Sequence, residues 1–209
     1  MSDDIKKVGL AALQEVRLDP RLENMLDSAA RTAGGTAEWR ARKRSEVHDL
    51  LALCHLAPRR LAVERVSLAQ DIHADLRMRV PVATRREPNG DMEVADEARL
   101  SLVYPREALY TPVPGAAFVT IREPLGAWYP QVPVGPVQLL CLGETLPANI
   151  PLREIVLLSY GALTMQTIQI DERDPGGVFN SEAALWWQAN THRIPLSDEP
   201  FLGVPEAAA

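Results

Sequence analysis

The sequence predicts an α+β fold, in which an antiparallel sheet carries flanking helices. Three observations lead to this prediction. A segment with helical periodicity spans residues 36–56, four segments with strand-like alternation follow one another between residues 61 and 121, and helical patterns return after Pro151. Because no helix separates the four strand-like segments, we expect a four-stranded meander rather than βαβ units.

Residues 1–35 are expected to form a helical N-terminal extension. Two short helical segments, 5–16 and 20–33, are closed by the pair Gly34-Gly35. Thr36 is then the expected N-cap of the next helix, and Pro58 lies just beyond the end of that helix.

The four expected strands are segments in which apolar and polar residues alternate, as they do in half-buried strands. Asn89-Gly90 is a pair typical of a hairpin turn or a short loop. The four segments are residues 61–68, 76–82, 100–104 and 117–121.

A proline-rich stretch follows the strands. Nine of the 17 prolines lie between Pro105 and Pro151, so this stretch can hold little regular structure. Long irregular segments of compact domains are usually functional or disordered. This one contains Tyr, Trp and Cys residues, and we interpret it as functional.

Two helices are expected after this stretch. Pro151 suits the first turn of one helix, and Asn180 is the expected N-cap of the other. Trp186 and Trp187 point in different directions on a helix, so at least one of them should lie in the core. The expected buried face of the first helix consists of Leu152, Ile155, Val156 and Leu163.

Composition and charge exclude several classes of protein. A net charge of −6 argues against a general nucleic-acid binder. The longest nearly apolar run, residues 155–165, is too short to span a bilayer, and the acidic N-terminus does not resemble a signal peptide. We therefore expect a cytoplasmic protein with no membrane partner, whose two cysteines are both free thiols.

Cys141 is the first candidate for chemistry. It lies after the proline-rich stretch in the run 137–143, and two interpretations are open. It can be a small buried hydrophobe, as most free cysteines are. Alternatively, Gly143 and the flanking prolines indicate a loop in which a partner can reach the thiol.

Cys54 is expected to pack in the core instead. It shares one helical stripe with Val47, Leu50 and Leu51. The adjacent His55 points about 100° away on a helix, so it cannot serve as a base for this thiol.

The remaining patterns predict no metal and no other cofactor. The four histidines are scattered, and none has metal-ligand spacing to another His or Cys. No phosphate-binding glycine loop and no Gly-x-Ser-x-Gly motif occurs. A basic cluster is interpreted as a solvated face or, alternatively, as a docking surface for an acidic protein. Its residues are Arg40, Arg42, Lys43 and Arg44.

Several runs, taken in order, resemble the ubiquitin-conjugating enzyme family. In that family a strand ends in an aromatic-Pro pair, and a Tyr-Pro-x-x-Pro-Pro-like loop and Phe-x-Thr follow. Then come aromatic-His-Pro-Asn and the active-site Cys-Leu. The runs here are Leu102-Val-Tyr-Pro105, Leu109-Tyr-Thr-Pro-Val-Pro114, Phe118-Val-Thr120, Trp128-Tyr-Pro-Gln-Val132 and Cys141-Leu-Gly143.

Later runs extend the resemblance, which covers residues 36–195. Pro147 and the helix beginning at Leu152 look like the family's Pro and its following helix. Asp174-Pro175, with Glu182-Ala-Ala184 after it, resembles an Asp-Pro-x-x-x-Glu-x-Ala segment beside the active site. The resemblance implies a ubiquitin-conjugating-enzyme-like fold for residues 36–197, followed by a C-terminal tail, 198–209.

The activity that the resemblance implies is acyl transfer. Cys141 would accept a ubiquitin-like protein as a thioester from a ubiquitin-activating-like enzyme and pass it to an amine of a target protein. The sequence is similar to bacterial members encoded beside ubiquitin-like and activating-enzyme-like proteins in antiphage defence operons, which share its loose match to the eukaryotic pattern.

Two departures from the family pattern affect the implied site. Tyr129 stands where the family has His, Gln131 stands where it has Asn, and the gap to Cys141 is slightly longer. By resemblance, the Gln131 amide stabilises the oxyanion of the tetrahedral intermediate, while Tyr129 packs against the loop or hydrogen-bonds to it. Asp174 helps desolvate or orient the incoming lysine, or is an ordinary turn residue before Pro175.

Two other interpretations stay open. One is a catalytically inactive variant that binds ubiquitin-like proteins, although such variants usually lack the active-site Cys. The other is a structural α+β module with both cysteines buried. Since Lys6, Lys7 and Lys43 are the only lysines, self-modification on lysine is expected at these positions.

Overall fold

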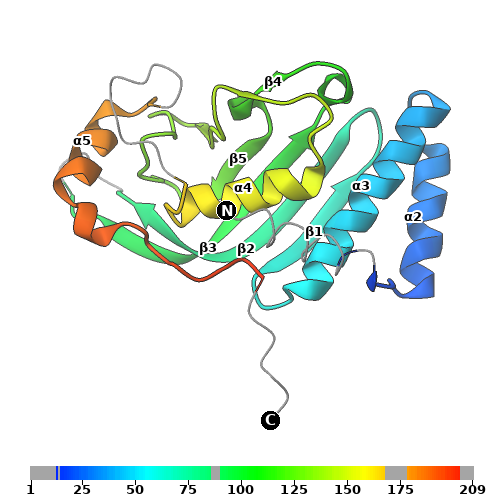
Figure 1. Ribbon diagram of the computed structural model, residues 1–209, viewed down its shortest axis with the longest axis horizontal. Coiled ribbons are helices and arrows are strands. Elements are labelled where there is room, and N and C mark those ends of the chain that lie inside the picture. The colour runs from blue at the N-terminus through cyan, green and yellow to red at the C-terminus, as the bar shows by residue number, and fades with distance from the viewer. Residues whose placement is uncertain (1–12, 14, 86–89, 168–177, 203–209) are drawn as a thin grey trace, which may run out of the picture.

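The computed structural model describes residue 13 and residues 15–85, 90–167 and 178–202 of the 209-residue chain, and in this part the fold is α+β (Figure 1). The strands β1, β2, β3, β5 and β6 form one antiparallel sheet in that order, so the predicted four-stranded meander is confirmed and gains a short fifth strand. The main-sheet strands are β1 (Leu61–Ser67), β2 (Ile72–Thr84), β3 (Glu93–Tyr104), β5 (Val119–Glu123) and β6 (Gln138–Leu139).

The proline-rich stretch contains only short elements, as expected. Within it, β4 (Val113–Pro114) pairs with β7 (Thr145–Leu146) in a separate two-stranded sheet. Two 3₁₀ turns, η1 (Arg106–Leu109) and η2 (Gly115–Ala117), flank β4, and a third, η3 (Thr191–Arg193), lies near the C-terminus.

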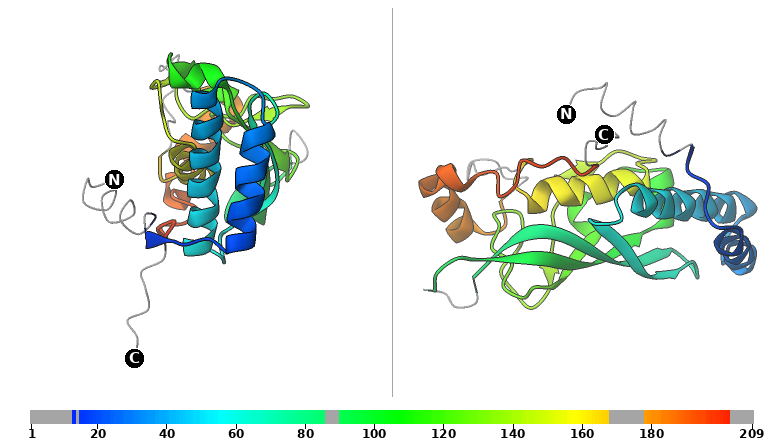
Figure 2. Two further views of the ribbon diagram at one scale, coloured as in Figure 1. Left: turned by 90° about the vertical axis from the view of Figure 1, so that its right-hand side faces the viewer. Right: turned by 90° about the horizontal axis from the view of Figure 1, so that it is seen from below.

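Two of the four described helices, α3 (Ala37–Leu56) and α4 (Leu152–Leu163), cover one face of the sheet (Figure 2). The other two are α2 (Pro20–Thr32) and α5 (Ser181–Ala189). Figure 2 shows α3 and α4 lying on the same side of the sheet, with α2 beyond α3. None of the described helices is both long and apolar enough to cross a bilayer.

Helix ends follow the predicted signals. The hydroxyl of Thr36 accepts a hydrogen bond from the Trp39 amide at 3.2 Å, and the side chain of Asn180 accepts one from the Ala183 amide at 3.0 Å. The sequence-predicted helix 20–33 is α2, which ends at Thr32. The predicted helix 5–16 and Asn89 of the expected turn fall largely outside the described residues.

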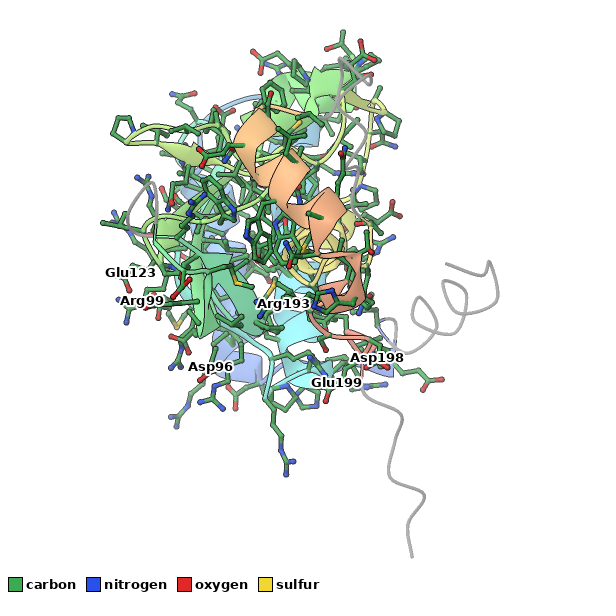
Figure 3. The ribbon with its side chains drawn as sticks, turned by 90° about the vertical axis from the view of Figure 1, so that its left-hand side faces the viewer. Asp96, Arg99, Glu123, Arg193, Asp198 and Glu199 are labelled. Carbon is green, nitrogen blue, oxygen red and sulfur yellow. The ribbon has the colours of Figure 1, made fainter. Side chains whose placement is uncertain are left out.

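The other face of the sheet carries charged side chains, because residues alternate between the two faces of a strand. Arg77 lies 3.7 Å from Glu64. Arg99 lies 3.6 Å from Glu123, and Figure 3 labels this second pair. Charges of both signs are interspersed here, so this face is suited to contact with water.

The core face of α3 differs in part from the predicted stripe. Val47 and Leu50 are buried as expected, but Leu51 and Cys54 are only half-buried, and Leu53 is buried in their place. The reason is that Lys43 and Glu46 also lie on the buried side of this helix, so its apolar pattern does not mark the inward face completely.

Lys43 corrects the interpretation of the basic cluster as a solvated face or docking surface. Its side chain is fully buried, and its ammonium donates to the carbonyls of Gly34, Leu68 and Ala69 at 3.0, 2.8 and 2.9 Å. The ammonium also lies 5.2 Å from the centre of the Trp39 ring. This residue ties the α2–α3 turn to the β1–β2 turn.

Glu46 joins α3 to the start of α4. Its carboxylate accepts a hydrogen bond from the Leu152 amide at 2.6 Å and pairs with Arg42 at 2.6 Å. Nearby, the Tyr104 hydroxyl donates to the carbonyl of Ile150 at 2.7 Å. The N-terminal end of α4 is therefore fixed by a carboxylate, which suits the positive end of a helix dipole.

Lys43→Met should destabilise the fold strongly. Replacing the ammonium leaves the carbonyls of Gly34 and Leu68 without this donor, while the Ala69 carbonyl keeps the Gly34 amide as its donor. Because one unsatisfied buried group costs about 1–3 kcal/mol, we expect the free energy of unfolding, measured in urea, to fall by at least about 2 kcal/mol. Arg59→Met, at an exposed position, is the control and should stay within about 0.5 kcal/mol of the wild type. If Lys43→Met and Arg59→Met lowered the free energy of unfolding equally, the stabilising role of the buried Lys43 ammonium would be contradicted.

Glu46→Gln should remove a pH dependence of stability. Burial raises the pKa of Glu46 above its ordinary value. Between the ordinary and the raised pKa the folded chain holds a proton that the unfolded chain has lost, so the free energy of unfolding falls as pH rises through this window. Urea titrations at a series of pH values should show this fall in the wild type and in Glu38→Gln, whose position is exposed, but not in Glu46→Gln.

Candidate active site

The C-terminal end of α4 is held by several segments from other parts of the chain. The Tyr129 hydroxyl donates to the carbonyl of Leu163 at 2.9 Å, and the Gln131 side-chain amide donates to the carbonyl of Ala162 at 3.3 Å. The backbone N–H of Leu196 donates to the carbonyl of Thr164 at 2.8 Å. The last carbonyls of a helix lack partners within it, and here donors from two segments, the loop with Tyr129 and Gln131 and the segment with Leu196, supply them.

Cys141 is attached to the same structure through Gln131. The Cys141 backbone N–H donates to the Gln131 carbonyl at 3.1 Å, so two residues ten positions apart are held side by side. Cys141 follows β6, the edge strand of the main sheet. The end of the sheet and the end of α4 thereby meet at this cysteine.

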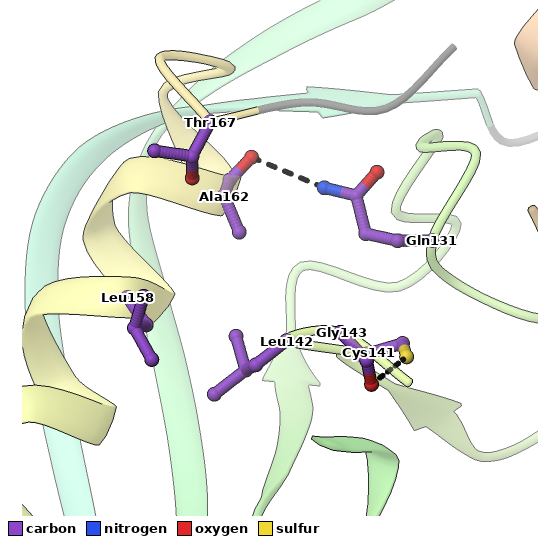
Figure 4. Close-up of a pocket in the computed structure, with 7 residues that line it drawn as sticks. All are labelled: Gln131, Cys141, Leu142, Gly143, Leu158, Ala162 and Thr167. Carbon is purple, nitrogen blue, oxygen red and sulfur yellow. Dashed lines mark hydrogen bonds between the residues drawn. The ribbon is translucent and has the colours of Figure 1, made fainter. Parts of the chain in front are cut away.

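A cavity of about 110 Å³ lies between α4 and the Cys141 loop (Figure 4). This volume is far above the ~10–15 Å³ that one water molecule needs. Leu142, Leu158 and Ala162 provide apolar wall, while Gln131 and Thr167 add polar groups. Cys141 and Gly143 complete the lining.

The thiol of Cys141 is less accessible than the loop interpretation expects. Cys141 is only 5% exposed, and its sulfur lies 3.2 Å from the carbonyl oxygen of Gly143, a thiol–carbonyl hydrogen bond. Gly143 adopts a φ of +129°, which lets its carbonyl turn back toward the sulfur. The expectation of an open thiol is therefore wrong for this conformation, although the expected proximity to Gln131 is found.

Gly115 explains why the Gly143 turn stays closed. A Cβ atom on Gly115 would lie 2.3 Å from the Gly143 carbonyl oxygen and 2.8 Å from its nitrogen, so the two backbones can touch only because Gly115 has no side chain. Gly115 carries no catalytic or binding motif in the sequence. The Pro114-Gly115 pair signals a turn, but not its long-range contact.

Gln131 is buried, with 6% of its surface exposed. One N–H of its amide is used by Ala162, and its side-chain oxygen is buried with no hydrogen-bond partner in the part of the chain that the structure describes. A buried acceptor without a partner is costly, so the conformation of this side chain is not fully determined by its bonds. In this structure Gln131 caps a helix; the expected role toward an oxyanion stays a prediction.

Tyr129 is fully buried and links three elements. Its hydroxyl accepts a hydrogen bond from the Ala83 amide on β2 at 2.8 Å and donates to Leu163 on α4. Burial raises the pKa of Tyr129 well above its ordinary value, so the hydroxyl stays protonated at neutral pH. The contacts give Tyr129 a positioning role between sheet, loop and helix.

The other sequence candidates lie elsewhere. Asp174 and Pro175 fall outside the described residues, so the predicted role of Asp174 stays a prediction. Cys54 is half-buried, and burial raises the pKa of its thiol to about 11, which keeps it protonated and unreactive. Within the described residues, no group of three or more His, Cys, Asp or Glu side chains could hold a metal ion.

Comparison of the chain with protein-family models, with curated proteins and with solved structures found no match in any of the three.

Gly115→Ala should expose the Cys141 thiol. The added methyl group displaces the Gly143 turn and removes its carbonyl from the sulfur. We expect alkylation of Cys141 by iodoacetamide, followed by mass spectrometry, to become about tenfold faster, a gain of about 1.4 kcal/mol in opening. Cys54 in the same chain is the internal control. An unchanged Cys141 rate would show that this contact does not limit access.

Proposed function

We propose that this protein is a ubiquitin-conjugating-like enzyme of bacterial antiphage defence, acting in the cytoplasm. Cys141 takes over the C-terminal glycine of a ubiquitin-like protein from an activating enzyme and transfers it to an amine of a target protein. The observation that carries the proposal is the 3.1 Å hydrogen bond that holds Cys141 beside Gln131 at a cavity.

The order of elements supports the proposed family. Helix α3, four meander strands, an irregular segment with the cysteine, and then α4 and α5 follow one another along the chain. The resembling runs fall in corresponding places: Tyr104-Pro105 ends β3, and Trp128 to Val132 lies between β5 and Cys141. We therefore assign the finer fold, a ubiquitin-conjugating-enzyme-like domain, as part of the proposal.

The chemistry consists of two acyl transfers. In the first, the Cys141 thiolate attacks the carbonyl carbon of the thioester on the activating enzyme; a new C–S bond forms, and the thiolate of the activating enzyme leaves. In the second, an amine nitrogen attacks the Cys141 thioester; the C–N bond forms, the C–S bond breaks, Cys141 leaves as thiolate, and the amine proton passes to water. Both steps need the sulfur to leave the Gly143 carbonyl.

Gln131 is the residue assigned to the oxyanion of the second step. A positioned amide donor stabilises such an oxyanion by about 2.7–4 kcal/mol. An amide has two N–H groups, and the bond to Ala162 uses one of them, at a long 3.3 Å. The donor to the oxyanion is either the second N–H of the Gln131 amide or the first one, once its hydrogen bond to the Ala162 carbonyl is broken.

A second candidate is an inactive variant that binds ubiquitin-like proteins without catalysis. The 5% exposure of Cys141 and the use of Gln131 as a helix cap favour it. The two candidates differ in one property: only the enzyme forms a covalent adduct on Cys141 and then passes the acyl group to an amine.

The deciding experiment uses a peptide thioester ending in Gly-Gly as the acyl donor and free lysine as the acceptor. The enzyme should form a dithiothreitol-labile adduct on Cys141, not on Cys54, and discharge it to lysine faster than the same thioester on a short cysteine peptide. Cys141→Ser should give a dithiothreitol-resistant ester, and Cys141→Ala no adduct. We call formation of the Cys141 thioester loading and its transfer to lysine discharge. The enzymatic assignment would be overturned if Cys141 loaded no faster than Cys54, or if discharge from Cys141 were no faster than from the cysteine peptide.

Gln131→Ala should slow discharge to lysine more than loading. Loss of one oxyanion donor predicts a fall of about 10²–10³-fold in discharge, because attack by the amine is the harder step and depends on a stabilised oxyanion. Loading exchanges one thiolate for another and should depend on this donor less. The exposed Gln70→Ala is the matched control. Both rates are measured by mass spectrometry over time. If the rates of loading and discharge fell by the same factor, Gln131 would instead be assigned a role in holding the loop.

A further inference from the structure

The turn at the C-terminal end of α4, residues 161–167, is strained at Met165, which lies just after the helix. Met165 has a φ of +60°, in the left-handed region that non-glycine residues rarely occupy, and it is almost fully buried. Such a conformation costs on the order of 1–3 kcal/mol and persists only where its surroundings hold it. The turn is tight, since the Gln166 and Thr167 amides both donate to the Gly161 carbonyl, at 2.9 and 3.2 Å.

A C-terminal strap, residues 194–202, holds this turn from outside. Figure 1 and Figure 2 show it running back along α4 after α5. The side-chain amide of Gln166 donates to the carbonyls of Ser197 and Glu199 at 2.8 and 2.9 Å, and the Leu196 N–H donates to Thr164. Three bonds thus join the strap to residues 164–166.

The far part of the strap is anchored on the body of α4. The Tyr160 hydroxyl donates to the Glu199 carbonyl at 2.8 Å, and the Phe201 ring packs edge-on against Tyr160 at 5.2 Å. Arg60, next to β1, donates to the Tyr160 hydroxyl and pairs with the Glu199 carboxylate at 2.5 Å. The strap is therefore fixed independently of Gln166, and Gln166 is the side chain that connects it to the strained turn.

The turn also carries the atoms to which the candidate site is attached. Gln131 is bound to the carbonyl of Ala162, which also accepts the Met165 amide at 3.2 Å. Gln131 in turn holds Cys141. Hydrogen bonds, linked by the covalent chain between Gly161 and Ala162, thus connect the strap through Gln166 to the end of α4. From there they continue through Gln131 to Cys141.

Building on the proposed function, we propose that Gln166 is a positioning residue for transfer from Cys141. By tying the strained turn to the C-terminal strap, it fixes the Ala162 carbonyl and so the placement of Gln131 relative to the thioester. It touches neither the acyl group nor the amine.

The test compares Gln166→Glu, which replaces the donor with an acceptor facing two carbonyls, with Gln166→Arg, which retains N–H donors. Gln70→Glu introduces the same charge at an exposed position of the β1–β2 turn and is the matched control. Loading and discharge are measured with the Gly-Gly peptide thioester and free lysine. Iodoacetamide alkylation of Cys141 and the melting temperature are measured on the same proteins.

Gln166→Glu should slow discharge about tenfold while loading stays within about twofold, because misplacement of a positioning group affects the transition state of transfer. It should also change the alkylation rate of Cys141 at an unchanged melting temperature. Gln166→Arg should restore both rates, and Gln70→Glu should match the wild type.

The inference would be overturned if Gln166→Glu discharged its thioester and reacted with iodoacetamide at wild-type rates. It would also be overturned if loading and discharge fell by the same factor and the melting temperature fell with them. A wild-type protein that does not load Cys141 would overturn the proposed function instead. The alkylation rates then decide whether Gln166 acts on Cys141.

Discussion

The carbonyl groups at the end of α4 are the constraint on which the candidate site depends. A helix that ends inside a protein must find donors for its last carbonyls, and α4 obtains them from Tyr129, Gln131 and Leu196. These donors come from the proline-rich stretch and from the C-terminal strap. Satisfying the helix end therefore folds two irregular segments against it, and one of them carries Cys141.

Under the proposed function, this constraint gives Gln131 two uses that compete. As a cap it keeps the loop against α4, and as an oxyanion donor it must face the thioester carbonyl. The long 3.3 Å bond and the unpartnered side-chain oxygen make the capped arrangement weakly determined, which favours a side chain that can change partners. Tyr129 does not share this ambiguity, because its hydroxyl has a donor and an acceptor partner and it can hold the loop while Gln131 moves.

The sequence predicted what depends on neighbouring residues. Caps such as Thr36 and Asn180 and the alternation of the strands are local signals, and they located the helices and the meander. Lys43 was misread because its three carbonyl partners lie in turns up to 26 residues away. The burial of Cys141 depends on a contact between Gly115 and Gly143, which lie 28 positions apart, and no local pattern encodes it.

The distribution of amines bears on where the acyl group would go. Lys43 is the only lysine in the described part of the chain, and its side chain is fully buried with its nitrogen donating to three backbone carbonyls, so a thioester cannot reach it in the folded chain. No other side chain in the described residues carries an aliphatic amine. The expectation that Lys43 accepts an acyl group is therefore wrong for the folded chain. A thioester on Cys141 would meet no lysine nucleophile on the described surface, so its acceptor would be an amine outside the described residues, such as Lys6 or Lys7, or one on another protein.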